Sequence, residues 1–200
     1  MTLSRLFLER YDPLTTYWLP GVLGRVNDDQ MRRRPHPRCN SIAWILWHIA
    51  RVEDAGLNRF VADDPQVFDE GGWAERMNVP LRHHGSGMTL AEVDDLSARI
   101  DLAALRAYAD AVQARTRAIV ADLDAQLDAD PGRLDAAVAP ERLRAIVFDE
   151  GLARSDPDGL FANYTGWSRG KCLMTFGLTH PYQHLGEMEV LTALLGVEYG

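Results

Sequence analysis

Cysteine is scarce in this 200-residue chain, and we find neither a signal-peptide pattern nor a membrane-spanning stretch in its sequence. Two cysteines, Cys39 and Cys172, are too few for a disulfide framework, which favours a reducing cytosol. The N-terminus has no basic stretch followed by an apolar one, so we expect no signal peptide. No uncharged run approaches the roughly 18 apolar residues that a membrane span needs. These absences predict a cytoplasmic protein without membrane contact.

Positive charge is also in short supply. The chain has 29 acidic and 21 basic residues, which gives a net charge of −8. This balance is a poor match for a phosphate backbone, so we expect no nucleic-acid partner. Only Lys171 among the basic residues is a lysine. The arginines at 32–34 are flanked by Asp28 and Asp29, which favours a solvated connection over an anion-binding role.

Apolar residues at spacings of three and four predict four long helices, at about residues 3–22, 41–61, 102–127 and 171–195. The second is apolar over most of its circumference and is expected at the centre of the bundle. Asn40 or Ser41 can cap it, and Asp101 can cap the third. Pro181 either begins the fourth helix, with Thr179 as its cap, or kinks it.

The connections between these helices are long. Residues 62–88 are irregular and predict a lid or binding loop. Thr89 and Glu92 form a capping box for a short helix that ends near Arg99. Residues 133–169 predict a loop with one short helix that begins at Pro140. The fold expected is therefore an all-α four-helix bundle, one domain over residues 1–200, with long connections and one or two short extra helices.

Three of the six histidines fall on inward helical faces. His180 and His184 are four residues apart, so both imidazoles lie on one side of the fourth helix and can converge on one ion. His48 has a similar position on the second helix. Each histidine alone is more typical of a core residue bonded to a carbonyl or carboxylate. Together, in a helical bundle, they predict a metal site about as strongly as a structural role.

Two segments resemble the DinB-like superfamily, which includes the N-terminal domains of mycothiol-dependent maleylpyruvate isomerases. They are residues 41–54, around His48, and residues 179–187, in which Gly186 and Glu187 follow the second histidine of the pair. The resemblance extends over roughly residues 3–197. It implies a four-helix bundle in which His48, His180 and His184 ligate a divalent metal. Pro181, between the paired histidines, departs from the family pattern.

The resemblance further implies a metal-dependent enzyme that acts on a small molecule, such as a thiol S-transferase or isomerase with mycothiol as cosubstrate. Imidazole ligands suit zinc, nickel, copper or iron, and the spacing does not distinguish among them; zinc or nickel is the metal that we expect. A non-catalytic metal- or ligand-binding bundle, associated with a stress response, is the alternative. Dimerisation through the first or third helix is plausible for such a bundle. The partner expected is a small substrate or a low-molecular-weight thiol.

Glu187 lies on the same helical face as His184. It is interpreted either as a catalytic base or hydrogen-bond partner at the metal, or as a carboxylate paired with an arginine of another helix. Arg169 or Lys171 can hold a substrate carboxylate, although exposure without such a role is commoner. His83 and His84 either cover the site or are solvated. The remaining interpretations are structural: a buried inert thiol at Cys172, and core positions for Trp44 and Trp73.

Overall fold

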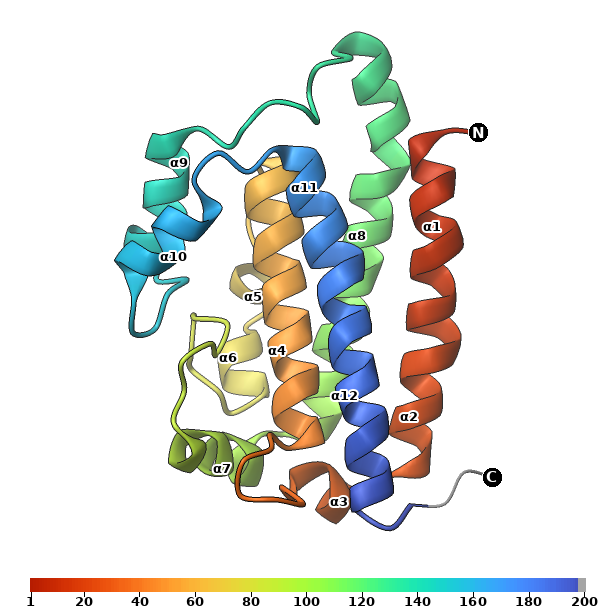
Figure 1. The fold of residues 1–200 in the computed structure, drawn as a ribbon, viewed down its shortest axis with the longest axis vertical. Helices are drawn as coiled ribbons and strands as arrows, with labels where there is room; N and C mark the ends of the chain where they lie inside the picture. The colour runs from red at the N-terminus through yellow and green to blue at the C-terminus, as the bar shows by residue number, and fades with distance from the viewer. Residues whose placement is uncertain (198–200) are drawn as a thin grey trace.

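The computed structural model describes residues 1–197, and four long helical columns lie side by side in it (Figure 1). The first column is α1 (Leu3–Pro13), η1 (Leu14–Trp18) and α2 (Leu19–Arg25), and the second is α4 (Ile42–Asp54) and η2 (Ala55–Ala62). The third is α8 (Leu102–Ala129), and the fourth is α11 (Arg169–Met174), η4 (Thr175–Thr179) and α12 (His180–Leu194). The all-α bundle is confirmed. No helix in this part of the chain is long and apolar enough to cross a bilayer.

The second column is the centre of the bundle, as its composition predicts. Every residue of α4 is buried, and the helix packs against α8 and α12. Ser41 caps α4 by accepting a hydrogen bond from the Trp44 N–H at 3.0 Å. Close packing continues beyond α4, where Gly56 faces Phe176 so closely that a Cβ would lie 2.4 Å from the ring. Glycine is therefore required for η2 and η4 to approach each other.

The fourth column passes Pro181 without beginning there. It begins at Arg169, where Ser168 accepts a cap hydrogen bond from the Lys171 N–H at 3.1 Å. Thr179 has helical dihedral angles and makes no cap hydrogen bond, so it is not an N-cap. A proline removes one hydrogen bond from a helix, and the wider π-helical turn η4 directly before Pro181 accommodates that loss. The aim of His180 is thus set within a continuous helix.

The connections contain more short helices than the one or two expected. Residues 62–88 include α5 (Val67–Glu70) and α6 (Trp73–Arg76), and residues 133–168 include α9 (Pro140–Arg144), η3 (Ala145–Asp149) and α10 (Pro157–Tyr164). The remaining two are α3 (Asp28–Arg32) and α7 (Leu90–Arg99). The capping box of α7 is present as predicted. Helices of four or five residues contain barely one turn, so their sequences show no apolar repeat.

A buried ion pair ties the 62–88 connection to the bundle. The Asp54 carboxylate accepts hydrogen bonds from the N–H groups of Val67 at 2.8 Å and Phe68 at 2.9 Å, and from the Tyr108 hydroxyl at 2.6 Å. Arg51 lies 3.3 Å from the same carboxylate and also donates to the Arg82 carbonyl. A buried charge is tolerated only when it is paired and hydrogen-bonded. The network therefore holds both ends of the connection in place.

The arginine run at 32–34 also has a structural role. Arg32 donates to three carbonyls at the C-terminal end of α7, among them Ser97 at 2.7 Å. Arg34 forms a two-pronged contact with Asp94, with one N–O distance of 2.6 Å. Free carbonyls at a helix end attract a cation in this way. The run is thus only partly solvated, and it fastens α7 to the chain ahead of α4.

Candidate metal centre

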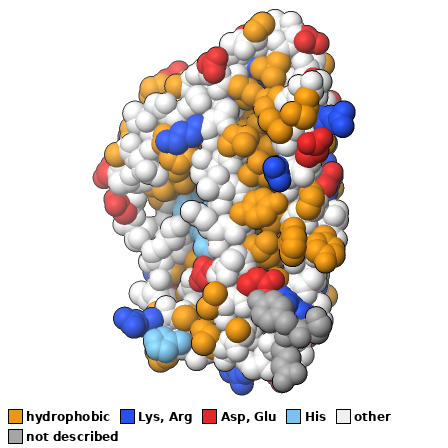
Figure 2. Space-filling model, turned by 45° about the vertical axis from the view of Figure 1, so that its right-hand side comes forward, with side chains coloured by type: hydrophobic (Ala, Val, Ile, Leu, Met, Phe, Trp, Pro, Cys, Tyr) orange, Lys and Arg blue, Asp and Glu red, His pale blue; other side chains and the backbone are white. Residues whose placement is uncertain are grey.

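The three predicted histidines meet between the second and fourth columns. One ligand nitrogen from each of His48, His180 and His184 lies within 4.8 Å of the other two. The Nε2 atoms of His48 and His180 are 3.0 Å apart. His48 is 5% exposed, and the two histidines of α12 are half-buried. Figure 2 shows pale-blue histidine side chains within a hollow to the left of the centre of the view.

His48 is held on two sides. Its Nδ1 bonds to the main-chain carbonyl oxygen of His84, which can only accept, so His48 carries its proton on Nδ1 and directs the Nε2 lone pair toward the other histidines. The Trp44 ring stacks on the imidazole at 4.7 Å between centroids with an interplanar angle of 13°. This pairing of an outward N–H with a backbone carbonyl is typical of histidines that bind metals.

His184 is held by Glu187. The Glu187 carboxylate lies 2.8 Å from His184 Nδ1, which again leaves Nε2 directed at the shared point. Residues three apart on a helix are neighbours, so α12 itself brings the two side chains together. Among residues 1–197, Glu187 forms its ion-pair contact with His184, and it forms no salt bridge with an arginine. Of the interpretations open from the sequence, the structure favours a partner that orients a ligand.

The imidazoles of His48 and His180 are neutral at neutral pH. Burial lowers the pKa of His48 to about 4, and the carbonyl of His84 offsets this only in part. Burial, with the neighbouring His48 and His184, lowers the pKa of His180 to about 2. Removal from water penalises the charged form of an imidazole, and three imidazoles close together penalise it further. Neutral nitrogens retain the lone pairs that a metal requires.

The residues present fit a divalent transition metal. An ion bonded to two imidazole nitrogens at 2.0–2.1 Å in tetrahedral geometry sets those nitrogens roughly 3.3 Å apart. The separation of 3.0 Å between His48 and His180 is close to this distance. Without an ion, the same contact is a hydrogen bond in which His180 Nε2–H donates to His48 Nε2. Three protein ligands leave at least one coordination position open.

The structure does not bring Arg169 and Lys171 to the histidines. Arg169 donates to the Val61 carbonyl at 2.8 Å and pairs with Asp63 at 3.0 Å. The Lys171 ammonium lies 3.7 Å from the centre of the Trp167 ring. Because the fourth column begins at Arg169, about three helical turns separate these residues from His180. They stabilise the end of the bundle away from the site.

The interpretations of the cysteine and the tryptophans as core residues are confirmed. Cys172 is fully buried, and burial raises the pKa of its thiol to about 12, so it is inert. Trp73 and Trp44 are both core residues, although Trp44 also covers His48.

Sequence reasoning underestimated His84, which was expected either to cover the site or to be solvated. His84 is buried beside His48, whose ring centre is 5.9 Å from its own. Its main-chain carbonyl orients the imidazole of His48. The sequence gives no indication that one of two adjacent loop histidines is buried. His84 is buried only because residues 62–88 run over the bundle and cover it. His83 remains half-buried, edge-on to Trp47 at 6.1 Å.

The protein is an all-α bundle in which three histidines of the second and fourth columns converge, an arrangement that could hold a metal ion. The chain belongs to the DinB superfamily, whose sequence pattern it matches over residues 18–188. It is also similar to a conserved protein from Enterococcus faecalis of known crystal structure, with a TM-score of 0.70, 15% identity and 99% of each chain covered. Identity this low shows the fold alone. No curated protein matches the chain.

Proposed function

We propose that this protein is a metal-dependent enzyme of small-molecule metabolism or detoxification that uses a low-molecular-weight thiol of the mycothiol type. The observation that carries the proposal is the convergence of three imidazoles on one point, two of them only half-buried. Structural zinc sites are usually closed by four ligands, whereas an open position is typical of catalytic sites. Zinc and nickel are the metals that we assign to this ligand set.

Each residue of the site has a distinct task in this proposal. A divalent ion held by His48, His180 and His184 would lower the pKa of a thiol or water and so supply a nucleophile at neutral pH. Glu187 is a positioning residue, because its carboxylate meets the outward nitrogen of His184. Trp44 excludes water from one face of His48. In the transfer, the thiol gives its proton to solvent water, its sulfur bonds to an electrophilic carbon of the substrate, and the bond from that carbon to the leaving group breaks, with the leaving group keeping the electron pair.

Elemental analysis of the untagged protein tests the metal site. We expect about one equivalent of a transition metal in the wild type and its loss in both His48→Ala and His184→Ala. His36→Ala is the matched control, because His36 lies in an exposed turn and its ring nitrogen only accepts from the Arg38 N–H. Equal metal content in all four proteins, or none under metal-replete conditions, would refute the site.

Thiol-dependent conjugation, measured with metal-saturated protein over a panel of electrophiles, tests the activity. We expect turnover that requires both thiol and metal and that is lost in His184→Ala. Stoichiometric metal without any turnover would instead favour the non-catalytic alternative, a metal- or ligand-binding bundle with a stress-response role. The net charge of −8 supports a small-molecule partner over a nucleic acid.

A further inference from the structure

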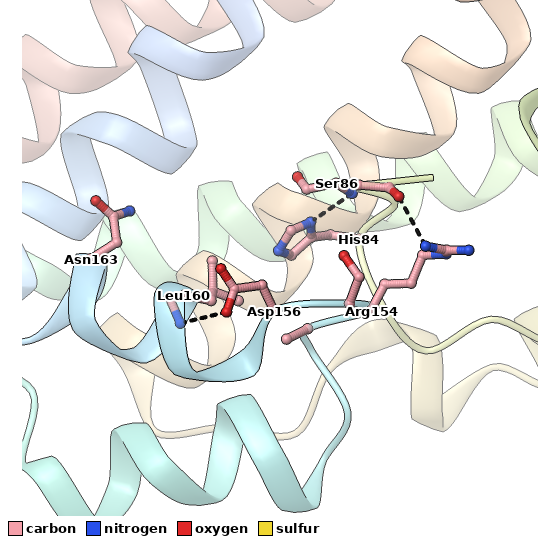
Figure 3. A pocket seen from close by; sticks show the side chains of 10 residues that line it. His84, Ser86, Arg154, Asp156, Leu160 and Asn163 are labelled. Atoms are coloured by element: carbon pink, nitrogen blue, oxygen red, sulfur yellow. Dashed lines mark hydrogen bonds between the residues drawn. The ribbon is translucent and has the colours of Figure 1, made fainter. Parts of the chain in front are cut away.

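A cavity of about 280 Å³ lies between the turn at residues 84–87 and the segment 153–163, which includes α10 (Figure 3). His84, Ser86 and Gly87 form one wall, and Arg154, Asp156 and Asn163 belong to the other. His84 connects this cavity to the metal centre. Its main-chain carbonyl bonds to His48, while its imidazole lines the cavity.

His84 presents a hydrogen-bond donor that nothing in residues 1–197 satisfies. Its side chain is buried, and its Nε2 atom has no hydrogen-bond partner there. Its Nδ1 accepts from the Ser86 N–H at 3.3 Å, so the ring proton is on Nε2. In Figure 3 this second nitrogen faces the side of the cavity on which Leu160 lies. A buried N–H without an acceptor is unfavourable, and a bound oxygen atom removes the penalty.

The charges around the cavity disfavour an anion. Arg154 is committed elsewhere, because it donates to the Gly87 carbonyl at 2.9 Å and pairs with Glu92. The Asp156 carboxylate accepts from the Gly159 N–H at 2.8 Å and has no ion-pair partner among the residues that the structure describes. Its negative charge repels a second carboxylate, but its second oxygen can accept from an N–H or O–H group. An uncharged ligand with both an acceptor and a donor fits this pattern.

We infer that this cavity binds an amide group of a small uncharged molecule, whose carbonyl oxygen accepts from His84 Nε2 and whose N–H donates toward Asp156. Its volume lies near the lower end of the range for small-molecule sites. A ligand bound here is separated from His48 by one imidazole, with ring centres 5.9 Å apart. The inference rests on the proposed function only if the bound amide is taken to be part of the enzyme's substrate. Binding of the amide by itself requires no reaction.

Nitrogen-15 NMR of histidine-labelled, zinc-loaded protein tests the inference directly. The probes are N-acetylglycinamide and N-acetylglycine, which differ only in the exchange of an uncharged amide for a carboxylate. We expect N-acetylglycinamide to shift the His84 Nε2–H signal and the acid to bind about tenfold more weakly, because of Asp156. No response of the His84 ring to the amide would overturn the inference, as would equal affinity for the acid.

Two variants of His84 separate the donor from the shape of the side chain. His84→Phe keeps the ring but removes the N–H, so we expect the affinity for N-acetylglycinamide to fall about tenfold. His84→Gln carries an amide N–H of similar reach and should retain most of the affinity. Leu160→Trp fills the cavity from the opposite wall, so it should abolish binding even if His84→Phe fails to fold. Unchanged binding in Leu160→Trp would overturn the inference.

Elemental analysis of each variant measures its metal content. This measurement lets failure of the cavity inference be told apart from failure of the proposed function. A protein that binds the amide without a metal or turnover would refute the metal-dependent enzyme and leave the cavity assignment standing. A protein with metal and turnover but no response at His84 would refute the cavity assignment alone.

Discussion

At the scale of single residues, the contact between Glu187 and His184 is the most accessible test of how the metal ligands are held. The carboxylate orients the imidazole through its contact with Nδ1. We expect Glu187→Gln to weaken metal binding about 10–100-fold in a competition titration with a chelator. Glu141→Gln is the control, because Glu141 is exposed on α9, and it should bind the metal as the wild type does. Equal affinity in Glu187→Gln would contradict the positioning role.

Glu53 makes stability depend on pH. It is fully buried, and its carboxylate accepts from the hydroxyls of Tyr11 and Thr116, the latter at 2.7 Å. Burial raises its pKa from 4.5 to about 7; Asp54 raises it further, and Arg117 lowers it. The folded state therefore holds the proton more tightly than the unfolded state. The stabilisation is complete below pH 4.5 and is lost as the pH rises to about 7.

Glu53→Gln removes this titration while retaining an oxygen for the two hydroxyls. We expect the free energy of unfolding of the wild type to fall by about 3 kcal/mol relative to that of Glu53→Gln between pH 4.5 and pH 8. Urea unfolding at several pH values measures the difference. Parallel pH profiles for the two proteins would show that Glu53 does not titrate in this window.

At the scale of elements, the turn at residues 84–87 carries His84 to its place. Gly85 has a φ of +93°, and a Cβ there would lie 2.6 Å from the Trp47 ring and 3.1 Å from Trp44. Both the dihedral angle and the close approach require glycine. The turn can therefore lie flat on the tryptophans of α4 and present the His84 carbonyl to His48.

We expect Gly85→Ala to lower the free energy of unfolding by about 1–3 kcal/mol and to weaken metal binding as well, since the turn must lift from α4. Urea unfolding and the chelator titration measure the two effects. Gly21→Ala is the matched control: Gly21 lies in α2 with no atom within 4 Å of an added Cβ, so stability should rise by about 0.5–1 kcal/mol. If Gly85→Ala lost stability but kept its metal affinity, the turn would have no role in holding the metal site.

The elements differ in how well their sequences predict them. Ser41, Thr89 and Asp101 mark helix starts that the structure places where expected, because a cap is a local hydrogen bond between close neighbours. The π-helical turn before Pro181 carries no such signal, since it depends on how the fourth column packs on η2. The short helices of the connections are likewise set by contacts with the bundle.

At the scale of the whole molecule, exposed apolar side chains gather on one face (Figure 2). Tyr17 and Trp18 on η1 and Val190 on α12 are 49–68% exposed. The Tyr182 hydroxyl donates to the Arg10 carbonyl at 2.8 Å, so the first and fourth columns adjoin there. The exposed large apolar residues of the described chain include none on α8. We therefore place the proposed dimer surface on the first helix rather than on the third.

We expect the protein to be a homodimer through this face, because a contiguous apolar surface is stabilised by a second copy of itself. Light scattering coupled to size exclusion should give about twice the mass of the chain for the wild type, and the monomer mass for Trp18→Glu. Leu90→Glu, which adds the same charge at an exposed apolar position on α7, should remain dimeric. A monomeric wild type at micromolar concentration would contradict the expectation.

The helical class, the central place of the second column and the inward positions of His48, His180 and His184 can all be predicted from the sequence alone. These properties depend on apolar periodicity and on hydrogen bonds between near neighbours, both of which can be read along the chain. Three other features emerge only when the whole chain is folded: the burial of His84 against His48, the distance of Arg169 and Lys171 from the site, and the cavity beside it. Those facts join segments distant in sequence, and their positions follow from how the whole chain packs, which no local pattern records.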